Sequence, residues 1–123
     1  MKLPQLLLLL TISVGLALGQ VLFKKAANQL RLDLETKSVW FAAISNGELL
    51  GALALYAVLT VLWVYALMDL ELSKAYPFMA LTMVTTPLLA AVVFHERLDR
   101  DFFIGMAAIV VGLYFVARSA PPG

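Results

Sequence analysis

Two adjacent lysines, Lys24 and Lys25, directly follow a long apolar stretch that begins near the start of the chain. Ammonium groups at the boundary of a membrane attract the phosphate groups of lipids. Gln20 lies one helical turn before Lys24, and its amide can bond either to another helix or to a substrate. The alternative is that both lysines anchor a helix end and set its topology. These three residues are therefore candidates for substrate binding, with plain membrane anchoring left open.

A second set of candidates is a group of hydroxyl-bearing residues near two prolines in a later apolar stretch. Thr82, Thr85 and Thr86 follow Pro77 and precede Pro87. Proline inside a helix frees a backbone carbonyl one turn earlier, and threonine hydroxyls can satisfy such groups within a membrane. The pattern predicts a kinked, polar helix that suits a transport cavity, although a kink needed only for packing explains it as well.

Three further side chains are candidates for substrate contact. Tyr76 precedes a proline, and its hydroxyl can reach the lipid headgroup layer. Trp63 offers an indole N–H within another apolar stretch, where it also suits ordinary packing. Glu96 is the third candidate, with the alternative that it pairs with Arg97 or Arg100 in a surface contact of little energetic value.

Several kinds of chemistry are disfavoured by the composition. The chain has no cysteine and one histidine, so we expect no metal site. No motif for nucleophilic catalysis, metalloprotease chemistry or nucleotide binding is present, and we expect neither an enzyme nor a cofactor. The net charge of +1 gives no indication of nucleic-acid binding.

The elements that must position these residues are membrane helices. Of the 123 residues, 63% are hydrophobic and 14% are charged, whereas soluble domains have about 25% charged residues. A helix needs about 20 apolar residues to cross the hydrocarbon core of a bilayer. The sequence therefore predicts an all-α integral membrane protein, one domain over residues 1–123, with a loop at 24–48. Its four transmembrane helices are expected at about 3–23, 49–68, 75–94 and 102–118. The first stretch also fits a signal peptide loosely.

Four helices are few for a transport path, so we expect a dimer. Gly105, Ala108 and Gly112 share one face of the fourth helix, where a second helix could approach closely. The same face could instead pack within one subunit. Lysine and arginine are more frequent on the side of the first and third connections, which favours termini outside the cytoplasm. The bias is modest, and both parallel and antiparallel dimers stay open.

Short motifs over nearly the whole chain resemble the drug/metabolite transporter superfamily, in its four-helix branch of EamA-like and small multidrug resistance-like proteins. The motifs are Gly19-Gln20 with Lys24-Lys25-Ala26, Leu62-Trp63 with Ala66-Leu67, LSKAYPF at 72–78, HERL at 95–98, Ile104-Gly105-Met106 and Val111-Gly112.

Within that branch, two subfamilies differ at diagnostic positions. Small multidrug resistance exporters carry a glutamate in the first helix where this chain has Leu16, and a tryptophan in the third helix where it has Met79. The aminoarabinose–undecaprenyl-phosphate flippase subunits share Gly-Gln followed by a lysine, Ala-Tyr-Pro and His-Glu. All three motifs are present here, the last two at residues 75–77 and 95–96.

The resemblance implies a flippase-like carrier of a polyprenyl-phosphate-linked sugar in a bacterial inner membrane, working as a dimer with an identical or similar subunit. It implies that Lys24 and Lys25 receive the phosphate and that Gln20, Tyr76 and the threonines bind the sugar. Pro87 would let the third helix bend during alternating access. An exporter of cationic or amphipathic metabolites and an accessory membrane subunit remain alternatives.

Overall fold

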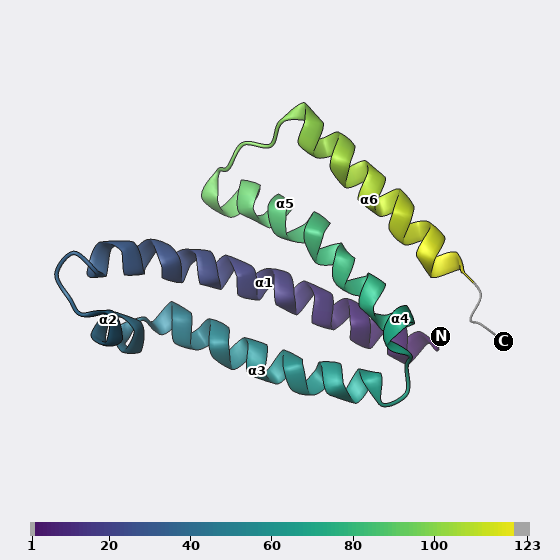
Figure 1. The fold of residues 1–123 in the computed structure, drawn as a ribbon, viewed down its shortest axis with the longest axis horizontal. Coiled ribbons are helices and arrows are strands. Elements are labelled where there is room, and N and C mark those ends of the chain that lie inside the picture. The colour runs from purple at the N-terminus through teal and green to yellow at the C-terminus, as the bar shows by residue number, and fades with distance from the viewer. Residues whose placement is uncertain (1, 120–123) are drawn as a thin grey trace.

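The computed structural model describes residues 2–119, and all regular secondary structure in this range is helical. Figure 1 shows α1 between α3 and α5, with α6 on the outer side of α5. In chain order the elements are α1 (Leu3–Asp33), α2 (Val39–Ser45), α3 (Gly47–Leu67), α4 (Leu72–Ala75), the 3-10 helix η1 (Tyr76–Leu81), α5 (Thr82–Phe94) and α6 (Arg100–Arg118).

Four helical segments are long and apolar enough to cross a membrane, which confirms the predicted architecture. They are Leu3–Asp33, Gly47–Leu67, Leu72–Phe94 and Arg100–Arg118, the third being the continuous run of α4, η1 and α5. The spans lie within a few residues of the predicted ones at most ends. The protein is therefore a multi-pass membrane protein.

The expected loop at 24–48 is wrong for most of its length. Helix α1 continues ten residues beyond the apolar stretch, to Asp33, and α2 occupies part of the remainder. Charge ends the apolar stretch but not the helix, because lysine, alanine, glutamine, leucine and arginine all have high helix propensity. The Gln29 side chain also donates to the Asp33 carboxylate at 3.1 Å, one turn later. Lys24 and Lys25 thus lie inside α1 instead of at its end.

Close packing between α1 and α3 depends on two glycines. A Cβ at Gly15 would come within 2.7 Å of a Leu59 methyl group, and one at Gly19 would overlap the Tyr56 ring. Both glycines therefore serve packing within the subunit, where small residues let membrane helices approach. A core cluster beside them joins α1 to α3 and α4: Leu9, Ile12, Ala66 and Ala75.

Within the third span, α4 leads into a tighter 3-10 helix, η1, which includes Pro77. The buried Ser13 hydroxyl of α1 donates to the Phe78 carbonyl at 2.8 Å. In an α-helix that carbonyl would accept from the N–H of Thr82, which here bonds to Met79 and Ala80 instead. Ser13 therefore joins α1 to η1 and gives the Phe78 carbonyl a second partner, beside the N–H of Leu81 that 3-10 geometry supplies. Pro87 lies inside α5, which remains helical to Phe94.

Candidate functional site

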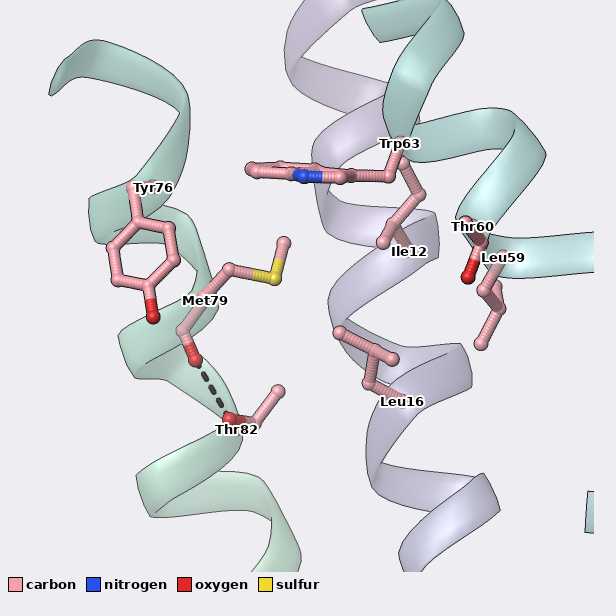
Figure 2. Close-up of a pocket in the computed structure, with 8 residues that line it drawn as sticks. All are labelled: Ile12, Leu16, Leu59, Thr60, Trp63, Tyr76, Met79 and Thr82. Carbon is pink, nitrogen blue, oxygen red and sulfur yellow. Dashed lines mark hydrogen bonds between the residues drawn. The ribbon is translucent and has the colours of Figure 1, made fainter. Parts of the chain in front are cut away.

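A cavity of about 280 Å³ lies between α1, α3 and the η1–α5 segment. We call it the Trp63 cavity; its volume is close to the lower end of the range of small-molecule sites, about 300–1,000 Å³. It brings together three sequence candidates, Trp63, Tyr76 and Thr82. The lining, drawn in Figure 2, is Ile12, Leu16, Leu59, Thr60, Trp63, Tyr76, Met79 and Thr82.

Some polar groups of the Trp63 cavity already form hydrogen bonds within the protein, and others are free to bind a ligand. The Thr60 hydroxyl donates to the Tyr56 carbonyl at 2.7 Å, and the Thr82 hydroxyl donates to the Met79 carbonyl at 2.6 Å. Both hydroxyl oxygens still have lone pairs that can accept. Within residues 2–119, no hydrogen bond engages the indole N–H of Trp63 or the hydroxyl of Tyr76. The cavity therefore offers two free donors and two acceptors on an apolar wall.

The positions of the two free donors follow from the packing described above. Trp63 packs against the core cluster and, as Figure 2 shows, reaches from α3 toward Tyr76 and Met79. Tyr76 begins η1, whose geometry is coupled to Ser13. Sequence reasoning missed Ser13, because a serine in an apolar helix is unremarkable until its partner is known. The indication in the sequence is that Ser13 is the single serine of the first apolar stretch, at 3–23.

Gln20 is engaged within the protein. Its amide nitrogen donates to the Tyr56 hydroxyl at 2.6 Å, and that hydroxyl donates to the Leu16 carbonyl at 3.3 Å. The Tyr56 ring also packs on Phe23, with ring centroids 5.0 Å apart. Of the two roles considered for Gln20, bonding across helices is therefore observed. Its amide oxygen remains available as an acceptor.

The three threonines do not share one site. Thr82 lines the Trp63 cavity, whereas Thr85 lines a separate, almost wholly apolar groove of about 320 Å³ between α1 and α5. The Thr85 hydroxyl donates to the Leu81 carbonyl at 2.9 Å. Thr86 lies one turn after Thr82 on the same face of α5, and its hydroxyl is buried without a partner among the described residues. Helix rotation thus separates residues that the sequence grouped.

The charged candidates lie at the other end of the bundle from Tyr76. Lys24 is twelve residues beyond Ile12 in α1, about 18 Å along the helix axis. Glu96 follows the end of α5, and Figure 1 shows that end on the same side as the later part of α1. Lys24, Lys25 and Glu96 are all exposed, and none makes an ion pair within residues 2–119. The structure therefore separates the candidate phosphate ligands from the Trp63 cavity.

The small-residue face of α6 is open within the subunit. Gly105, Ala108 and Gly112 are all exposed. A Cβ added at either glycine would meet no atom within 4 Å. Helix α6 packs only against η1 and α5 in its principal contacts, and the side chain of Asp99 caps its first turn by accepting from Phe102 N at 2.9 Å. Packing of this face within the subunit, one of the two alternatives considered, is not observed among residues 2–119.

Comparison with known proteins identifies the family. The EamA-like transporter family matches residues 3–118, which include all four spans and the Trp63 cavity. The chain belongs to this family of membrane transporters. The resemblance found in the short motifs is thereby confirmed.

The similar curated proteins are named as probable 4-amino-4-deoxy-L-arabinose-phosphoundecaprenol flippase subunits ArnE. The protein from Pseudomonas fluorescens is 34% identical over 93% of this chain and 98% of its own length. That from Pseudomonas aeruginosa strain UCBPP-PA14 is 33% identical over 92% and 96%, and that from Pectobacterium atrosepticum is 35% identical over 81% and 86%. No solved structure gives a significant match.

Proposed function

We propose that the protein is a flippase-like carrier that moves a polyprenyl-phosphate-linked sugar across the bacterial inner membrane by alternating access. The observation that carries this proposal is the similarity over nearly the full length to proteins named as subunits of such a flippase. The free donors and acceptors of the Trp63 cavity support it, because a sugar presents several hydroxyl groups that both donate and accept. A carrier of this kind performs no covalent chemistry.

The separation of the candidate residues suggests that the substrate contacts them in succession. Lys24 and Lys25, exposed at one membrane boundary, would hold the phosphate there. Trp63 and Tyr76 would hold the sugar toward the opposite side. The buried, unpartnered hydroxyl of Thr86 lies between these levels on α5 and would provide an intermediate hydrogen bond.

Other residues would assist this movement. The amide oxygen of Gln20 has no hydrogen-bond partner within residues 2–119 and would accept from the sugar. Pro87 would let α5 bend as access alternates. Glu96, at the end that also holds the lysines, would pair with a lysine or with an amino group on the sugar. The polyprenyl tail can stay in the bilayer, so only the polar head needs shelter.

A second subunit would complete the path. The Trp63 cavity is walled by three of the four spans, and α6 leaves its glycine face open. We propose that Gly105, Ala108 and Gly112 of α6 pack against a second four-helix subunit, identical or similar. Close approach of two membrane helices requires such small side chains. The relatives are themselves named as subunits.

The alternative of a proton-coupled exporter of cationic compounds finds less support in the cavity. Leu16, which stands where those exporters carry a glutamate, does line the Trp63 cavity. No carboxylate is present among the eight lining residues, so the cavity offers neither a counter-ion for a cation nor a proton acceptor.

Native mass spectrometry of the protein purified in mild detergent tests the proposal. We expect bound polyprenyl-phosphate lipid, with the sugar-bearing form retained in preference to the bare polyprenyl phosphate. Tyr76→Phe removes one free donor and should reduce that preference severalfold. Tyr65→Phe is the matched control, because Tyr65 is exposed on α3 and does not line the cavity. Retention of neither lipid by the wild type, or equal preference in both variants, would refute the assignment.

A further inference from the structure

Helix α2 carries a face of large apolar side chains that turns away from the rest of the fold. Trp40, Phe41 and Ile44 are 78%, 58% and 69% exposed, whereas Ala42 is fully buried. At about 100° per residue, the three exposed side chains fall within about 100° of arc, and Ala42 lies on the other side. We call Trp40, Phe41 and Ile44 the α2 face. It is a continuous surface on a helix held to the bundle by its opposite side.

A buried asparagine fixes the depth of α2 relative to the membrane. The side chain of Asn46 donates to the Ala26 carbonyl of α1 at 2.9 Å and caps α3 by accepting from Leu49 N at 3.0 Å. Ala26 directly follows Lys25 and lies less than one turn beyond the apolar stretch at 3–23. The junction of α2 and α3 is therefore at the level where α1 leaves the hydrocarbon core. That level corresponds to the lipid headgroup layer.

The direction of α2 agrees with a position on the membrane surface. Figure 1 shows α1 and α3 running across the view, whereas α2 is seen nearly along its axis. Helix α2 therefore crosses the direction of the spans and runs approximately parallel to the bilayer plane. After α1 ends at Asp33, the chain turns back toward the membrane to place α2 there.

Lysines lie near the level of α2, in a stretch that also carries Asp33, Glu35 and Glu48. Lys24 and Lys25 are exposed directly before Ala26. The Lys37 ammonium lies 5.4 Å from the centroid of the Phe41 ring and 3.8 Å from the Asp33 carboxylate. Aromatic side chains beside lysines are typical of segments that sit at the boundary between headgroups and acyl chains, where anionic lipids attract the cations.

We propose that α2 is an in-plane anchor whose face inserts into the headgroup–acyl boundary of the leaflet at the Lys24 end of the bundle. The partner is the lipid surface itself. A free helix of seven residues would bind a membrane weakly. Because α2 is joined to two spans, it is already held beside the bilayer and loses little translational entropy when its face inserts. Anchoring of α2 at this depth would also hold Lys24 and Lys25 at the depth of lipid phosphate. This inference does not depend on the proposed transport function.

Fluorescence quenching at Trp40 tests the proposal. The chain has two tryptophans, so Trp63→Phe leaves Trp40 as the only one. The protein is reconstituted in phosphatidylethanolamine–phosphatidylglycerol vesicles whose acyl chains carry bromine either near the headgroup or near the chain end. We expect shallow bromine to quench Trp40 at least twofold more than deep bromine, and aqueous iodide to quench it weakly. Subtracting the Trp40→Phe signal from the wild type gives the same quantity without altering Trp63.

A matched control places a tryptophan in the connection between α1 and α2. Glu35→Trp, in a chain with both native tryptophans replaced by phenylalanine, introduces an indole at an exposed position beyond the expected headgroup level. We expect iodide to quench it strongly and brominated lipid weakly. If Trp40 responds to iodide as strongly as this control, α2 lies in water and the proposal fails. Shielding of Trp40 from both iodide and bromine would show protein covering the face, which also overturns it.

Discussion

Replacing Ser13 by alanine removes the side-chain hydrogen bond that joins α1 to η1. The Ser13 hydroxyl is buried, and it donates to the Phe78 carbonyl at 2.8 Å. Hydrogen bonds between membrane helices contribute about 0.6 kcal/mol on average and about 1.7 kcal/mol at most. Because the Ser13 hydroxyl is buried in an apolar setting while the Phe78 carbonyl keeps its 3-10 bond, we expect a loss between these two values, about 1 kcal/mol. This corresponds to about a fivefold change in the folding equilibrium.

Loss of the Ser13 bond also removes a restraint on the 3-10 geometry of η1. If η1 relaxed into an α-helix, Phe78 O would exchange the N–H of Leu81 for the N–H of Thr82. A 3-10 helix turns about 120° per residue and an α-helix about 100°, so Tyr76, two residues before Phe78, would rotate by about 40°. Tyr76 would then leave its position at the Trp63 cavity. We therefore expect Ser13→Ala to weaken the preference for the sugar-bearing lipid as well as stability.

Unfolding of the detergent-solubilised protein in a denaturing detergent, followed by circular dichroism, measures the stability change. Thr11→Ala is the matched control, since the Thr11 hydroxyl donates only to the Leu7 carbonyl in its own helix. We expect the control to lose less than about 0.5 kcal/mol, as is usual for exposed positions. A stability loss for Ser13→Ala no greater than that of Thr11→Ala would refute the reasoning about the α1–η1 bond.

Three further predictions address the charges, the subunit interface and coupling. Lys24→Glu or Lys25→Glu should lose bound polyprenyl-phosphate lipid and transport in native mass spectrometry and vesicle assays, whereas arginine should retain part of both; Arg31→Glu, two turns further along α1, is the control. Unchanged lipid binding in correctly inserted glutamate variants would make both lysines plain anchors. Gly112→Leu should shift the protein toward monomer in mild detergent, and a fully dimeric variant would remove α6 from the interface. Proteoliposomes should show little uptake of quaternary ammonium dyes driven by a pH gradient, because Leu16 stands where the exporters carry a glutamate. Robust uptake abolished by a protonophore would contradict this inference.

The number of spans and the family could be predicted from the sequence alone. Bilayer thickness fixes how many consecutive apolar residues a span needs, so stretches without charge locate the four helices directly. The motifs at residues 75–77 and 95–96 pointed to the transporter family because short motifs are read without knowledge of contacts. Lys24, Lys25 and Glu96 could likewise be placed near one membrane boundary, since each lies beside an apolar stretch.

Only the tertiary structure decided which polar residues share a site. Thr82 and Thr85 are three residues apart, yet they line different cavities, because a few tens of degrees of helix rotation select the face that meets a neighbour. Ser13 and Asn46 acquired roles through partners far away in the chain, Phe78 and Ala26. Hydropathy reports where a chain enters lipid, but long-range contacts set helix rotation, and neither composition nor local spacing encodes them.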